Sequence, residues 1–94
     1  MLFAIHCLDK PDALPQRLIH HAAHRAYLAE GHARLVVAGP LLSDDGETML
    51  GSLFLVEVPS RAAAEAFNAH DPFVKEGIWE KVVIRRFDKK TDNR

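Results

Sequence analysis

Two short segments, residues 2–8 and 51–58, constrain the fold of this chain more than any other feature, because both are apolar on two faces. The first reads Leu-Phe-Ala-Ile-His-Cys-Leu and the second Gly-Ser-Leu-Phe-Leu-Val-Glu-Val. Apolar segments this short, followed by Asp9 in one case and Pro59 in the other, are typical of β-strands. A strand that is apolar on both sides is covered on both sides. We therefore expect a sheet whose two faces are both shielded from water.

The rest of the chain supplies two helices and two more strands. Residues 14–31 are rich in Ala, Leu, Arg and Gln, and Gly31 is suited to end a helix in a left-handed conformation. Ser60 is a good N-cap for a second, alanine-rich helix over residues 61–70. The two further strands are predicted at residues 34–38 and 79–87.

Turn residues set the boundaries of these elements. Gly39 and Pro40 are predicted to close the second strand, and the Asp-Gly turn within residues 43–48 predicts a hairpin into the third. Asp71 precedes a proline, which disfavours helical backbone, so the second helix is expected to end there. Residues 73–77 are predicted to form a turn.

The resulting order, β-α-β-β-α-β, predicts a ferredoxin-like α+β fold. Right-handed crossovers place both helices on one face of a four-stranded antiparallel sheet. The opposite face needs another cover, and a second copy of the chain is the simplest one, so a homodimer is predicted and further assembly is left open. The 94 residues, 48% of them apolar, suffice for one domain, expected at residues 1–88 with a polar tail at 89–94.

The net charge and the N-terminal sequence argue against several classes of partner. The formal charge is −1 and the Lys and Arg residues are scattered, which argues against a nucleic-acid groove. The N-terminus lacks a basic segment followed by a long apolar core, so no signal peptide, no membrane partner and a cytoplasmic location are expected. The single cysteine, Cys7, lies in an apolar strand and is predicted to be a buried packing thiol rather than a nucleophile.

His24 is one of two candidates for catalysis, and its orientation depends on the phase of the first helix. An unbroken helix would align an apolar stripe and turn His24 away from the core; this stripe comprises Leu14, Leu18, Ile19, Ala22, Ala26 and Ala29. A break near residues 19–21 would instead turn His21, His24 and Leu28 inward. Periodicity leaves both alternatives open.

Asp71 is the second candidate. Alone, an Asp-Pro pair after a helix is a common stop signal, just as a histidine on an alanine-rich helix is commonly a solvated side chain. The alternative is a carboxylate that accepts a hydrogen bond from one nitrogen of His24 and leaves the other nitrogen free to take a proton. His20 and His24 also form an HxxxH pair, but no third ligand is evident, so no metal site is predicted.

Several short motifs together resemble the YciI-like (YCII-related) family. They are His24-x-x-Tyr27-Leu28 on the first helix, Ala38-Gly39-Pro40-Leu41 at the end of a strand, Gly51-Ser52 at the start of the next, and Asp71-Pro72-Phe73 followed by Gly77. The likeness runs over residues 1–87. The resemblance implies a ferredoxin-like unit that pairs as a dimeric α+β barrel, with His24 and Asp71 as a catalytic pair and no metal or organic cofactor.

The resemblance also implies a reaction class, because one branch of the family comprises dehydrochlorinases of chlorinated hydroxyhydroquinones. We therefore expect acid–base elimination on a small cyclic or aromatic molecule. The residues predicted to line its pocket are His6, His21, Tyr27, Gly39, Pro40, Ser52, Phe73 and Trp79. Many family members carry arginine at position 21, and its absence weakens the expectation of an anionic substrate, unless Arg17 or Arg25 takes its place.

The sequence is also compatible with two other functions. The chain would also suit a non-catalytic dimeric module that holds a metabolite or docks on a partner. A cofactor-free monooxygenase rests on fold analogy alone.

Overall fold

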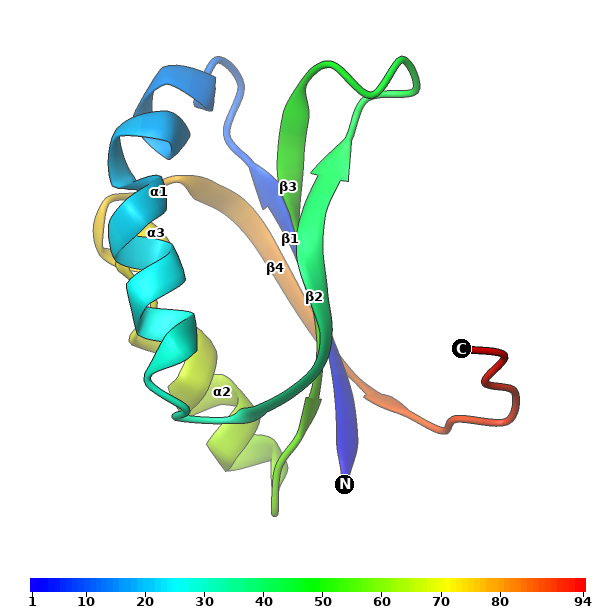
Figure 1. Cartoon of the computed structure of the whole chain (residues 1–94). Helices are drawn as coiled ribbons and strands as arrows, with labels where there is room; N and C mark the ends of the chain where they lie inside the picture. Colours follow the sequence, from blue (N-terminus) through cyan, green and yellow to red (C-terminus); the bar gives the residue numbers. More distant parts are fainter.

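Four strands pair into one antiparallel sheet in the order β2-β3-β1-β4, and the computed structural model describes all 94 residues around it (Figure 1). The strands are β1 (Leu2–Asp9), β2 (Arg34–Leu42), β3 (Met49–Glu57) and β4 (Trp79–Phe87). The helices are α1 (Leu14–Ala29), α2 (Arg61–Ala69) and the short α3 (Pro72–Lys75). This confirms the predicted ferredoxin-like α+β fold.

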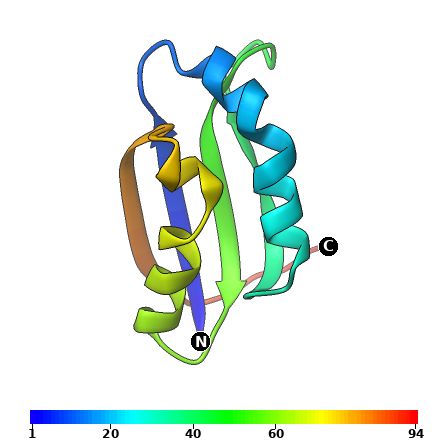
Figure 2. The same ribbon diagram turned by 90° about the vertical axis from the view of Figure 1, so that its left-hand side faces the viewer.

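All three helices lie on one face of the sheet (Figure 1). In the orthogonal view, α1 lies in front of β2, and α2 and α3 lie in front of β1, with β3 running between them (Figure 2). The core lies between these layers and includes Phe3, Ile5 and Cys7 of β1 together with Phe54 and Val56 of β3. Alternation along each strand explains which side chains enter it.

The two largest differences from the predicted elements concern the end of β2 and residues 72–75. Strand β2 does not close at Gly39 and Pro40 but continues to Leu42, with Pro40 paired to Ser52. An edge strand has a neighbour on one side only, and a proline is tolerated there. Residues 72–75 form helix α3 instead of a turn, because Asp71 caps it by accepting from the Phe73 N–H at 2.9 Å and Pro72 suits the first helical position.

Helix α1 is unbroken, yet its apolar stripe does not face the sheet. Leu18 and Ile19 are 56% and 67% exposed, and the side chains that point inward are Arg17, His21, His24 and Leu28. The second alternative is right about the inward face, which includes His21, His24 and Leu28, but wrong about the break, because α1 is continuous. Buried polar contacts, described below, decide the phase in place of apolar periodicity.

The second face of the sheet carries no helix. Leu8, Val37, Leu53 and Phe87 lie on it with about 40–48% of their surface exposed. Residues 88–94 follow β4 without regular structure and leave the domain on this side (Figure 1). None of the helices is both long and apolar enough to cross a membrane.

Candidate active site

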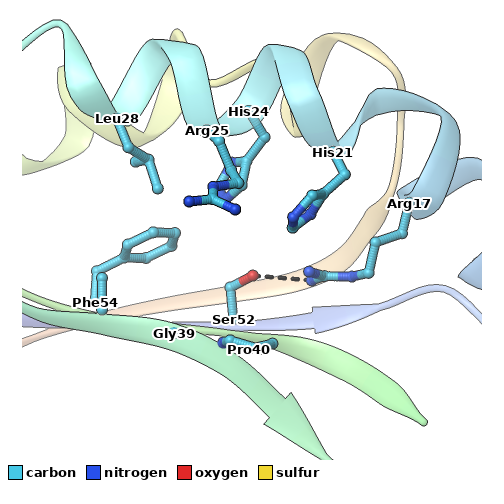
Figure 3. Close-up of a pocket in the computed structure, with 10 residues that line it drawn as sticks. Arg17, His21, His24, Arg25, Leu28, Gly39, Pro40, Ser52 and Phe54 are labelled. Carbon is cyan, nitrogen blue, oxygen red and sulfur yellow. Dashed lines mark hydrogen bonds between the residues drawn. The ribbon is translucent and has the colours of Figure 1, made fainter.

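A cavity of about 390 Å³ lies between α1 and the edge of the sheet formed by β2 and β3 (Figure 3). Residues from all three elements line it: Arg17, His21, His24, Arg25 and Leu28 from α1, Ala38, Gly39 and Pro40 from β2, and Ser52 and Phe54 from β3. No carboxylate is among them. The wall formed by α1 is therefore basic and the opposite wall is neutral.

His24 and Asp71, 47 positions apart in the sequence, form a buried hydrogen bond. His24 Nδ1 lies 2.9 Å from Asp71 Oδ1 and 2.8 Å from Oδ2. The two residues are only 6% and 1% exposed. An ionised carboxylate can only accept hydrogen bonds, so Nδ1 carries the proton in this pair. Nε2 has no hydrogen-bond partner in the chain, and His24 is one of the residues that line the cavity.

Aromatic contacts fix the orientation of the imidazole. The His24 ring stacks on Phe73, with centroids 4.1 Å apart and planes 6° apart. Phe54 and Trp79 meet it edge-on at centroid distances of 6.0 and 6.2 Å. Asp71 is fixed in turn as the cap of α3. The ring consequently has little freedom to leave its hydrogen bond.

A second buried network joins Asp9, Arg17 and Ser52. Arg17 is 1% exposed, and it donates to Asp9 from Nε at 2.7 Å and from Nη2 at 2.9 Å. Nη2 also donates to Ser52 Oγ at 2.8 Å (Figure 3). The guanidinium lies 4.8 Å from the ring of Phe73, so Phe73 contacts both Arg17 and His24. Because Ser52 Oγ accepts from Arg17, its own proton is free to be donated to a ligand.

His21 and Arg25 complete the basic wall. Burial lowers the pKa of His21, and the nearby Arg25, His24 and Arg17 lower it further. Its Nδ1 is buried and has no partner. Arg25 is largely exposed and has no acidic side chain within salt-bridge distance.

The structure brings some of the predicted site residues together and separates others. His24 and Asp71 are in contact, and His21, Gly39, Pro40 and Ser52 line the cavity beside His24. The catalytic role of the pair remains a prediction. His6, Tyr27, Phe73 and Trp79 do not line the cavity.

Each of these four positions has a physical reason. His6 lies on the helix-free face of the sheet, because alternation along β1 turns Ile5 and Cys7 toward the helices. Tyr27 points toward α2 and donates to the Phe67 carbonyl at 2.7 Å. Phe73 and Trp79 are buried around the His24 ring, as packing partners rather than cavity walls.

Other cavity residues are missing from the predicted set. The sequence indicates no site role for Leu28, Ala38 and Phe54, and it indicates Arg17 and Arg25 only as substitutes for an absent arginine. The spacing of Arg17, His21, His24 and Leu28 is that of one helical face, and it is the signal that could have identified the wall.

The HxxxH pair of α1 does not form a metal centre here. His20 Nε2 lies 3.5 Å from Glu76 Oε2, outside the cavity lining. No group of three or more His, Cys, Asp or Glu residues in the chain is arranged to hold a metal ion.

Comparisons with known proteins agree with the fold and add a family. The model of the YCII-related domain matches residues 1–88. Protein YciI of Escherichia coli O6:H1 is 35% identical over 96 residues, covering 95% of this chain and 98% of that protein. An uncharacterised protein of Haemophilus influenzae is 31% identical with the same coverage.

Among solved structures, the 5-chloro-2-hydroxyhydroquinone dehydrochlorinase (TftG) of Burkholderia phenoliruptrix, in complex with 2,5-dihydroxybenzoquinone, superposes with a TM-score of 0.85. It is 35% identical, and the match covers 94% of each chain. A NIPSNAP domain protein of Burkholderia xenovorans, 18% identical with a TM-score of 0.54, shares the fold alone. The chain therefore belongs to the YCII-related family.

Proposed function

We propose that this protein is an enzyme that uses His24 as a general base, oriented by Asp71, to eliminate a leaving group from a small cyclic or aromatic molecule. The observation that carries the proposal is the buried Nδ1–carboxylate hydrogen bond, which leaves Nε2 free beside a cavity. Asp71 would stabilise the imidazolium that forms when Nε2 takes the proton. The leaving group departs with its bonding electron pair.

The likeness to the dehydrochlorinase supports an elimination of hydrogen chloride from a hydroxylated ring. In such a step the substrate loses a proton to His24 and a chloride ion to solvent. The reaction balances without an added oxidant or reductant, because both atoms leave the same molecule. The Ser52 hydroxyl supplies a hydrogen-bond donor for a ring oxygen on the wall opposite α1.

Chloride release from 5-chloro-2-hydroxyhydroquinone tests the proposal directly. We expect His24→Ala to lower the turnover by about 10²–10⁴-fold, the usual contribution of a positioned general base. His20→Ala is the matched control, because His20 lies on the same helix but outside the cavity lining. Circular dichroism and the fluorescence of Trp79, the single tryptophan, check that both variants are folded.

The same assay separates catalysis from simple binding. Full activity in His24→Ala would contradict the assignment of the base. If the wild-type protein binds 2,5-dihydroxybenzoquinone but releases no chloride, the second candidate, a non-catalytic metabolite-binding module, is favoured instead.

We further propose that a second copy of the chain covers the helix-free face of the sheet. The support is the row of half-exposed apolar side chains on that face, among them Leu53 and Phe87. A monomer rarely leaves so many large apolar groups together in water. Light scattering coupled to size exclusion should give twice the chain mass for the wild type and the 10.5 kDa of one chain for Leu53→Glu. A monomeric wild type would refute the dimer.

A further inference from the structure

The charges that line the cavity are unevenly compensated. Arg17 is neutralised by Asp9, with which it shares two hydrogen bonds, and the pKa of the half-buried His21 is lowered by desolvation and by the nearby Arg25, His24 and Arg17. The Nδ1–H of His24 is bound to Asp71. Arg25 is the one cation of the lining that no acidic side chain approaches.

Arg25 also has the freedom that a ligand-binding residue needs. Its side chain is exposed and still lines the cavity, one position after His24 on α1 (Figure 3). The guanidinium has no hydrogen bond within the chain, so all five of its N–H donors are available. A planar donor group of this kind binds carboxylates and ionised hydroxyl oxygens through two parallel hydrogen bonds.

We propose that Arg25 is the specificity-determining residue of the cavity and that it selects small cyclic organic anions. The assignment rests on the proposed function in that it takes the same cavity as the substrate site. The ligand class is a ring that carries an ionised oxygen, either a carboxylate or an ionised enol or phenol. Arg25 holds that oxygen at the mouth of the cavity, and the ring lies over Phe54 within reach of His24 and Ser52.

Binding of two rings of the same size measures this preference without any turnover. The probes are 2,5-dihydroxybenzoquinone, an acidic enol that is ionised at neutral pH, and hydroquinone, which is uncharged. By calorimetry we expect the wild type to bind the anion about tenfold more tightly, a ratio that equals ~1.4 kcal/mol. Arg25→Gln should lose most of that ratio, and Arg25→Lys should keep part of it.

Arg61→Gln is the control of equal charge change, because Arg61 lies on α2, pairs with Glu65 and does not line the cavity. It should keep the wild-type ratio. Added salt should reduce the ratio of the two affinities in the wild type, since an exposed charge is screened. In Arg25→Gln the same ratio should hardly depend on salt. A merely structural role of Arg25 would not produce this difference.

Three outcomes would overturn the assignment of Arg25. They are an anion preference that survives in Arg25→Gln, a wild type that binds both probes equally, and a wild type that binds neither. Failure of the proposed function looks different. In that case the wild type prefers the anion and Arg25→Gln does not, but no chloride is released from the chlorinated substrate.

Discussion

Removing the Asp9 carboxylate should destabilise the protein more than any other conservative change at a polar residue. Arg17 is almost entirely shielded from water, and Asp9 supplies its only compensating charge through contacts at 2.7 and 2.9 Å. In Asp9→Asn the guanidinium keeps its shape complementarity and its bond to Ser52 but loses the opposite charge. A buried cation without a partner is costly.

The expected loss can be worked out from the geometry. Breaking a buried ion pair by removing one partner costs about 3–5 kcal/mol. The whole chain is expected to be stable by about 5–14 kcal/mol, from ~0.05–0.15 kcal/mol per residue. Asp9→Asn therefore removes a large share of the stability, and the melting temperature should fall by about 4–8 °C for each kcal/mol.

Replacing both partners tests whether the uncompensated charge is the cause. In Asp9→Asn/Arg17→Met no buried charge remains, and the methionine side chain can pack against Phe73. We expect the double variant to be more stable than Asp9→Asn alone, with a coupling energy of about 2 kcal/mol or more. Urea unfolding followed by the fluorescence of Trp79 gives the free energies of unfolding of the wild type, the two single variants and the double variant. All four proteins are measured at the same concentration, because self-association would shift these free energies. A cost below ~1 kcal/mol for Asp9→Asn would refute the reasoning, since it would mean that water from the cavity replaces the carboxylate.

Three further predictions concern single residues. Burial raises the pKa of the Cys7 thiol to about 12, so N-ethylmaleimide should label it only in urea; labelling of the native protein, detected by mass spectrometry, would contradict this. Burial, and then the charge of Arg25, lowers the pKa of His21. The midpoint of its NMR titration should therefore lie below the ordinary value of about 6.5 and should rise in Arg25→Gln. An unchanged midpoint in Arg25→Gln would contradict the coupling between the two residues. A side chain at Gly51 would clash with the Cys7 carbonyl oxygen, so Gly51→Ala should cost about 1–3 kcal/mol in thermal unfolding. Gly39→Ala, where an added Cβ meets nothing within 4 Å, should cost clearly less.

The strands were accessible to prediction because their pattern reflects the layers of the fold. Both faces of residues 2–8 are apolar, and the structure places one of them against the helices and leaves the other on the open face. The local sequence could not predict that β2 extends through Pro40. A proline is tolerated in a strand only if that strand is at an edge, and edge position follows from the pairing of the whole sheet.

Periodicity could not choose the phase of α1, because it assumes that a helix buries its apolar side. Here Leu18 and Ile19 face outward, whereas Arg17 and His24 are buried. Two carboxylates from other elements compensate for this burial. Their positions in the sequence bear no periodic relation to α1, so a helical pattern cannot indicate them. The setting of Asp71, before a proline at a helix end, suggested one of the two contacts. Asp9, at the end of an apolar strand, gave no such indication.

The two carboxylates also explain which side chains of α1 line the cavity. Asp9 binds Arg17 and Asp71 binds His24, and neither carboxylate lines the cavity. Their negative charges hold Arg17 and His24 in place without reaching the space that a ligand occupies. Buried polar groups are costly unless they are paired. These two contacts pair Arg17 and the Nδ1 of His24, and they leave Nε2 of His24 without a partner in the chain. The inverted helix and the proposed chemistry thus have one physical origin, and removing either carboxylate should disturb both.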